Sequence, residues 1–368
     1  MPYASARRYL AQAVALLPAD PWNELYAESM ALFLELAECE YLVGNFQRSD
    51  ELLTVVLEKA RSTLDRARVY RLRQRFYQLS GRYREAMAVA LVALRLFGVT
   101  LPESDEDIRV ATEAEIRQVP SNLRERRIAD LADAPMAADA DVRATIGLLA
   151  EAMPLVYTAR PALWPLITVK GVNLCLGHGH AEESPFVYSC YTMVLVSICG
   201  DIPSALQFSD MTLRLNERFQ GAAALRGKLL FHHAAVVNIW CRHFATNLPL
   251  LEQAFLACLD AGDLVCAGFL TYNAVWLRLE NGDPLDCIIQ VARRYAAFAR
   301  QSHNDIVYNV VRVEEQFAAS LKGATRASTD FSDGAFDEAD CVAAIEQAGF
   351  GLGTAYYSHH KADRGLHR

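Results

Sequence analysis

The sequence lacks the features of a membrane-spanning or exported chain. Its longest apolar stretches are broken by polar residues well short of the ~18 positions that a transmembrane helix needs. The opening residues 1–5, MPYAS, lead straight into an amphipathic helix and not into a signal peptide. We therefore expect a cytoplasmic protein that has no membrane partner.

The nine cysteines include no Cys-x-x-Cys pair, the spacing typical of zinc sites and thiol redox motifs. Five of them stand singly in apolar surroundings: Cys175, Cys190, Cys199, Cys258 and Cys266. We interpret these five as small buried hydrophobic residues of a reducing compartment, which agrees with a cytoplasmic location.

The sequence also lacks an excess of positive charge. Its 36 Lys and Arg residues face 44 Asp and Glu residues, for a net charge of −8. The arginine-rich run at 123–127, LRERR, carries an interleaved acid, which is typical of a solvated helix face. Because nucleic-acid binding needs a basic surface, we expect no nucleic-acid partner.

No segment alternates apolar and polar residues as a strand would, and apolar residues recur instead at helical spacing. In the segment 24–41 one stripe steps by 4, 3, 4 and 4 through Tyr26, Met30, Phe33, Ala37 and Tyr41. Similar stripes occupy the segments 49–60, 69–79 and 87–97. The sequence therefore predicts an all-α fold.

Two eight-residue segments, LVGNFQRS at 42–49 and LSGRYREA at 79–86, follow one pattern of apolar, any, Gly, polar, aromatic, two polar and small. Gly suits the left-handed end of a helix, the aromatic residue fills the angle between two helices, and the small residue lets the second helix pack closely. This is the pattern of a tetratricopeptide-repeat turn. Weaker copies begin at Gly200 and Gly262. The residues expected to build the turns are Gly44, Phe46, Ser49, Gly81, Tyr83, Ala86, Gly200, Ile202, Ala205, Gly262, Leu264 and Ala267.

The irregular spacing of the turns predicts a degenerate tetratricopeptide-like helical-repeat superhelix, an α-solenoid, without a strict repeat length. We expect an N-terminal helical block over 1–100 and a second block over 142–361. An acidic connector punctuated by prolines occupies 101–141. Residues 362–368 are expected to form a disordered or frame-shifted tail.

Three segments contain residue types that often carry chemistry. The run 221–229, GAAALRGKL, has one residue too many between its glycines and lacks the Ser or Thr of a phosphate-binding loop. The run 349–353 lacks the strand that precedes a dinucleotide loop. His178 and His180, with Glu182 and Glu183, would suit a metal but have no second pair at ligand spacing. We expect no cofactor, no metal and no catalytic residue.

Several further segments resemble the helical region of very large bacterial signalling proteins. The residues that carry the resemblance are 36–46, 94–102, 127–131, 154–157, 172–176, 184–191, 336–338, 349–351 and 355–357. The resemblance extends from Tyr3 to about Lys361 and departs from the family pattern at 132–139. After Tyr357 the family continues into another turn, whereas this chain runs through 362–368 and stops, as a truncated piece would.

In that family the helical region follows a protein-kinase-like domain and an AAA-type (STAND) ATPase and precedes GAF or PAS sensors and a histidine kinase. No catalytic residue of those domains falls on this chain. The resemblance implies a non-catalytic scaffold that binds protein partners or neighbouring domains. Because a repeat array cut mid-way exposes apolar surface at its ends, we also expect the chain to self-associate through them. Two alternatives stay open: a ligand-binding sensor with an aromatic-lined groove, and an enzyme that uses a metal at His178 and His180.

Overall fold

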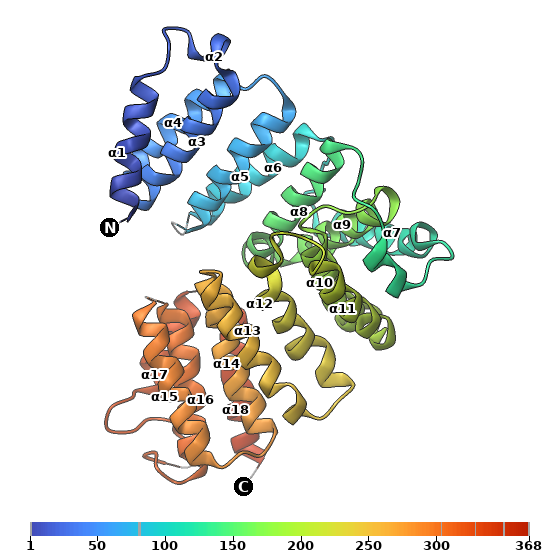
Figure 1. The fold of residues 1–368 in the computed structure, drawn as a ribbon. Coiled ribbons are helices and arrows are strands. Elements are labelled where there is room, and N and C mark those ends of the chain that lie inside the picture. The colour runs from blue at the N-terminus through green and yellow to red at the C-terminus, as the bar shows by residue number, and fades with distance from the viewer. Residues whose placement is uncertain (1, 80–81, 303, 328, 349, 367–368) are drawn as a thin grey trace. The chain divides into compact units, whose positions relative to one another are not determined.

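The computed structural model describes residues 2–79, 82–302, 304–327, 329–348 and 350–366. Within these residues all regular secondary structure is helical, and β structure is limited to two isolated bridges (Figure 1). The all-α prediction is therefore confirmed. None of the helices in this part of the chain combines the length and apolar character that crossing a membrane requires.

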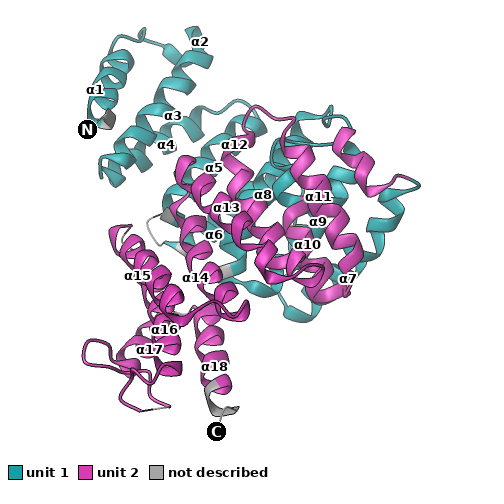
Figure 2. Cartoon of the chain, turned by 60° about the horizontal axis from the view of Figure 1, so that its bottom comes forward, with its two compact units in different colours: residues 1–125, 134–187 teal, residues 126–133, 188–368 magenta. Residues whose placement is uncertain are grey.

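The chain divides into two compact units (Figure 2). The first contains residues 1–125 and 134–187, and the second contains 126–133 and 188–368. The division passes through helix α10 (Ser184–Val194), whose first turn belongs to the first unit. The boundaries at 100, 141 and 361 that the sequence suggests stay a prediction.

The first unit is built from helices that follow one another through short turns. They are α1 (Pro2–Ala15), α2 (Pro21–Glu24), α3 (Tyr26–Leu42), α4 (Phe46–Lys59), α5 (Thr63–Leu79), α6 (Tyr83–Leu96), α7 (Asp105–Leu123), α8 (Ala140–Ala159), the 3-10 turn η2 (Pro161–Leu163) and α9 (Trp164–His178). Successive helices pack as hairpins, such as α3 with α4, α5 with α6 and α8 with α9.

The apolar stripe predicted in segment 24–41 lies on the buried face of α3. Met30 and Ala37 are buried, and Tyr26, Phe33 and Tyr41 pack against the same core from half-buried positions. The stripe spacing therefore locates the face of α3 that meets α4 and α5.

Helix α7 occupies much of the segment that the sequence marks as an acidic connector. The hydroxyl of Ser104 accepts a hydrogen bond of 3.1 Å from the backbone N–H of Asp107 and so caps the helix. Asp105, Glu106 and Asp107 in the first turn face the positive end of the helix dipole. The acidic run thus favours the start of a helix at this point.

The second unit contains the later helices. They are the 3-10 turn η1 (Ile128–Asp133), the rest of α10, the π-helical turn η3 (Leu195–Cys199), α11 (Ile202–Asn216), α12 (Ala222–His232), the π-helical turn η4 (His233–Val237), the 3-10 turns η5 (Asn238–Trp240) and η6 (Phe244–Thr246), α13 (Leu248–Asp260), α14 (Leu264–Glu280), α15 (Leu285–Gln301), α16 (Asp305–Leu321), α17 (Glu338–Gln347) and α18 (Gly351–Leu366).

One apolar core extends from α12 to α18, and α15 and α16 lie side by side along it (Figure 1). Several helices of the second unit begin at a side chain that accepts a hydrogen bond from their first turn: Asp201 at α11, Asp263 at α14, Asn304 at α16 and Asp337 at α17. These caps replace partners that the first N–H groups of a helix lack.

Helix α18 continues to Leu366 and therefore includes part of the segment 362–368 that the sequence suggests is a tail. Residues 367 and 368 lie outside the described residues.

The cysteine prediction is correct for Cys175, Cys190, Cys258 and Cys266, which are buried. It is wrong for Cys199, which is exposed because η3 ends there and Gly200 turns the chain into α11.

Candidate functional site

The turn glycines that the described residues include end a helix in a left-handed conformation. The φ angle is 90° at Gly44, 65° at Gly200 and 70° at Gly262. Gly adopts such angles without the strain that a Cβ atom would add. Gly81 lies outside the described residues, and the assignment of all these turns to tetratricopeptide repeats stays a prediction.

The small residues of the turn pattern are fully buried where the second helix meets the first. Ser49, Ala86, Ala205 and Ala267 each have a relative exposure of 0%. The hydroxyl of Ser49 donates a hydrogen bond of 2.8 Å to the carbonyl oxygen of Ala37, which joins α4 to α3. A larger side chain at these positions would separate the two helices of a hairpin.

The apolar residue two positions after each turn glycine is expected to fill the angle between two helices, but it is more exposed than that role implies. Phe46 is 54% exposed and rests against Tyr41 with ring centroids 5.1 Å apart. Leu264 is 46% exposed and Ile202 is half-buried. Tyr83 is the first residue of α6. Phe46, Ile202 and Leu264 each open a helix, where the side chain projects over the turn before it.

The run 221–229 forms the start of α12 and has no strand before it. Lys228, the residue that would bind phosphate in a nucleotide loop, lies with Nζ 3.0 Å from Oδ2 of Asp263. A Cβ on Gly227 would lie 2.4 Å from Sγ of Cys258, so this glycine permits the close approach of α13. The run therefore has a packing role in this structure.

His178 and His180 lie at the end of α9 and in the loop that follows. His180 is 1% exposed, and its backbone N–H donates to the carbonyl oxygen of Pro135 over 3.0 Å. Gly179 between them has φ of 105°, and a Cβ there would lie 2.7 Å from the Pro135 oxygen. No group of three or more metal-binding side chains occurs among the described residues.

Two Ser–His contacts, which no sequence pattern indicated, occur near the π-helical turn η4. Oγ of Ser189 lies 2.9 Å from Nδ1 of His232, and Oγ of Ser209 lies 2.9 Å from Nδ1 of His233. Burial, and then the charge of Lys228, lowers the pKa of His232 to about 4, while burial chiefly lowers the pKa of His233.

These contacts do not have the geometry of a catalytic triad. In a triad the nucleophile and the orienting acid bond to different ring nitrogens. Here Nδ1 of His233 faces both Ser209 and, at 4.0 Å, Asp210. Ser189 is only 3% exposed, which leaves it inaccessible to a substrate. Both pairs are consistent with neutral histidines that satisfy buried hydroxyl groups.

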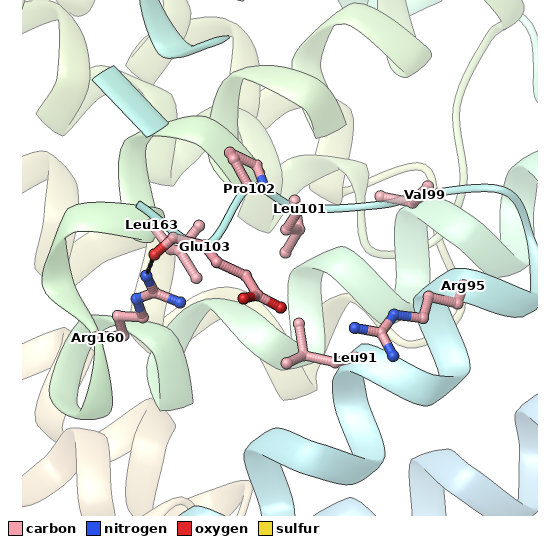
Figure 3. Close-up of a pocket in the computed structure, with 8 residues that line it drawn as sticks. All are labelled: Leu91, Arg95, Val99, Leu101, Pro102, Glu103, Arg160 and Leu163. Atoms are coloured by element: carbon pink, nitrogen blue, oxygen red, sulfur yellow. Dashed lines mark hydrogen bonds between the residues drawn. The ribbon is translucent and has the colours of Figure 1, made fainter. Parts of the chain in front are cut away.

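A pocket of about 320 Å³ opens in the first unit between the end of α6, the segment 99–103 and the start of η2 (Figure 3). Its lining is aliphatic and charged: Leu91, Arg95, Val99, Leu101, Pro102, Glu103, Arg160 and Leu163. The chain turns from α6 into segment 99–103 at Gly98, where φ is 74°. The sequence missed this pocket because its lining residues have no motif and lie up to 72 positions apart, from Leu91 to Leu163.

The described residues that line this pocket include no aromatic side chain. A cluster of aromatic side chains lies inside the second unit. The rings of Tyr272 and Tyr356 have centroids 5.3 Å apart, and Trp276 lies 6.2 Å from Tyr356. Tyr272 is buried and the other two pack against the core from half-buried positions. These aromatics join α14 to α18, whereas Trp240 is 59% exposed.

No family model matches the chain. The chain is similar to a protein described as "Hybrid signal transduction histidine kinase G" from Dictyostelium discoideum, with 22% identity over 323 residues. The similarity covers 82% of this chain and 9% of that protein. The likeness is to one region of a signalling kinase. It agrees with the expected resemblance to a signalling-protein region, whereas the restriction of that resemblance to bacteria stays a prediction.

Proposed function

We propose that this chain is a non-catalytic helical scaffold of a signal-transduction protein. The observation that carries the proposal is the extent of the similarity, which takes in most of this chain and less than a tenth of a hybrid histidine kinase. A region of that kind joins or regulates other domains, and its activity is that of a binding surface. The parent protein in this proposal is an ATP-dependent kinase with sensor domains.

The succession of helix hairpins supports a solenoid in which each hairpin packs on the next. Solenoids bind partners along extended surfaces, and exposed apolar side chains supply the contact area. In the first unit such side chains occur on α1, directly after it and on α4: Tyr9 is 64% exposed, Leu16 is 85% exposed and Phe46 is 54% exposed. We propose that α1 and α4 bind a neighbouring domain, or a second copy of the chain.

The experiment measures binding of the purified chain to the protein segments encoded on either side of it in its gene. We expect saturable binding to at least one segment, weakened at least about tenfold by Tyr9→Ser with Leu16→Ser, because buried apolar anchors dominate such interfaces. Val110→Ser is the matched control, since Val110 is 49% exposed on α7. Equal weakening by the control, or no binding to either segment, would contradict the proposal.

The same preparation tests the non-catalytic part of the proposal. We expect neither ATP hydrolysis nor autophosphorylation by the purified chain. ATP turnover that co-purifies with the chain through successive columns and persists in Lys228→Met would refute it. Light scattering over a range of concentrations tests self-association, for which we expect an apparent mass that rises with concentration.

A further inference from the structure

The pocket between α6, segment 99–103 and η2 has a volume at the lower end of the range for small-molecule sites, roughly 300–1,000 Å³. All of its lining residues belong to the first unit. Its lining has an aliphatic part and a charged part, and together they define the kind of ligand that fits.

The aliphatic part consists of five side chains from three segments: Leu91, Val99, Leu101, Pro102 and Leu163. Leu163, the last residue of η2, is 1% exposed and therefore lies at the buried side of the lining. None of these side chains can hydrogen-bond, so this part of the pocket favours a branched hydrocarbon group.

The charged part contains both signs. Arg160, at the C-cap of α8, donates a hydrogen bond to the main-chain oxygen of Glu103. The side chains of Arg95 and Glu103 extend into the same space from opposite sides (Figure 3). None of these three side chains forms an ion pair with another described residue. Arg95 and Glu103 are exposed and Arg160 is half-buried, so their charged groups can reach a ligand from the rim of the pocket.

We propose that this pocket binds a free aliphatic α-amino acid such as L-leucine. The guanidinium of Arg95, assisted by Arg160, binds the ligand carboxylate, and the carboxylate of Glu103 binds the ligand ammonium. The branched side chain of the ligand lies against Leu91, Leu101 and Leu163. Arginine pairs with carboxylates through two parallel hydrogen bonds, which gives orientation as well as affinity.

The mixed charge of the lining selects a zwitterion over simpler ligands. A fatty acid would offer no partner to the Glu103 carboxylate, and an alkyl amine would offer none to the guanidinium groups of Arg95 and Arg160. A residue inside a peptide carries neither charge at its α-carbon. A free amino acid carries both charges one carbon apart, beside its side chain.

Isothermal titration of the whole chain with L-leucine tests the proposal. We expect saturable binding at one site, and at least about tenfold weaker binding of 4-methylpentanoate, which lacks the ammonium, and of 3-methylbutylamine, which lacks the carboxylate. Either analogue binding as tightly as leucine would overturn the proposal, because one charged contact would then be absent.

Two variants locate the site. Arg95→Gln and Glu103→Gln should each weaken leucine binding at least about tenfold, whereas Arg84→Gln and Glu28→Gln, equally exposed but outside the pocket, should leave it unchanged. Circular dichroism identifies any variant that fails to fold. Unchanged binding in both pocket variants would overturn the assignment, as would an absence of saturable binding by the folded chain. No protein partner takes part, so this outcome is independent of the scaffold proposal.

Discussion

Two acidic sites, one in each unit, differ in how their carboxyl groups are neutralised. In the first unit Nη2 of Arg71 on α5 lies 2.7 Å from an oxygen of Glu151 on α8 and 2.7 Å from an oxygen of Glu183. Burial alone would lower the pKa of Arg71, but the hydrogen bond and charge of Glu151, with the charge of Glu183, raise it above its ordinary value. Nη2 of Arg75 also lies 3.6 Å from Glu151, so two cations face these two carboxylates.

In the second unit Glu314 on α16 has a relative exposure of 0%, and neither of its carboxyl oxygens has a hydrogen-bond partner among the described residues. Burial raises the pKa of this carboxyl well above its usual range. Glu314 is therefore neutralised by its own proton, and not by a neighbouring cation.

This contrast shows that a buried acidic side chain does not by itself stabilise the folded chain. Removing the partner of a paired acid destabilises the fold. Replacing an unpaired buried acid with an apolar side chain removes the free-energy cost of burying the carboxyl group. The two sites therefore predict opposite responses to substitution.

The largest effect is expected from Arg71→Met. This change removes the cation that lies 2.7 Å from both Glu151 and Glu183 and leaves only Arg75 among the described residues, 3.6 Å from Glu151. Loss of one partner of a fully buried pair costs roughly 3–5 kcal/mol. The three side chains are 31%, 22% and 25% exposed, so solvent screening reduces the expected loss to about 2–3 kcal/mol. Urea unfolding followed by circular dichroism measures it.

The matched control is Arg66→Met on the same helix, because Arg66 is exposed and forms no ion pair with a described residue. We expect its effect to stay within about 0.5 kcal/mol. Equal losses for the two variants would show that pairing of Arg71 contributes nothing beyond helix propensity.

A smaller effect of the opposite sign is expected from Glu314→Leu. The side chains have similar volumes, and removal of an unsatisfied polar group should stabilise the second unit by about 1–3 kcal/mol at pH 7. The neighbouring Glu315 is the comparison, since it lies 2.9 Å from Arg293 and 2.5 Å from Arg312. Glu315→Leu should destabilise, and stabilisation by both variants would contradict the distinction.

The stabilisation by Glu314→Leu should depend on pH. Below the ordinary pKa of 4.5 both the folded and the unfolded chain hold the Glu314 proton, so the charge adds no difference. As pH rises above that value only the unfolded chain releases the proton, so the wild-type free energy of unfolding falls by at most about 1.4 kcal/mol per pH unit. The advantage of Glu314→Leu over the wild type should therefore grow with pH.

The wild type must be measured beside the variant because buried histidines also make the free energy of unfolding depend on pH. Their effect has the opposite sign to that of Glu314. Burial, and then the charge of His359, lowers the pKa of His360 to about 3, and the pKa of His232 is about 4. Both groups bind protons more readily in the unfolded chain, so they reduce stability as pH falls below about 6.5. Both histidines contribute equally to the variant and to the wild type. The difference between the two free energies of unfolding therefore reports the effect of Glu314 alone.

The sequence predicted the helices well and the long-range contacts poorly. Helical spacing depends on neighbours three and four positions apart, so the stripe on α3 could be located. Glu314 could also have been found, because it occupies the next position of the stripe formed by Val307, Val310 and Val311. The contacts of Arg71, by contrast, join residues 80 and 112 positions apart, which no local pattern encodes.

The pocket shows the same limit. The sequence marks Leu101, Pro102 and Glu103 as part of a polar connector, because proline and acidic residues interrupt the apolar periodicity there. In the structure these residues lie between α6 and η2 and line a pocket. An interrupted pattern identifies a non-helical segment, but its neighbours depend on how the helices on either side of it pack.

The smallest effect should be shared by the two units and concerns their turn glycines. Gly44→Val and Gly262→Val introduce a Cβ atom with nothing within 4 Å of it, at φ of 90° and 70°. The cost is then backbone strain alone, about 1–2 kcal/mol for each variant by urea unfolding. Gly44→Asn should cost less, because Asn adopts left-handed angles more readily. A loss at Gly44 and none at Gly262 would mean that only the turn in the first unit depends on its glycine, and the sequence pattern shared by the two turns would then have different physical meanings in the two units.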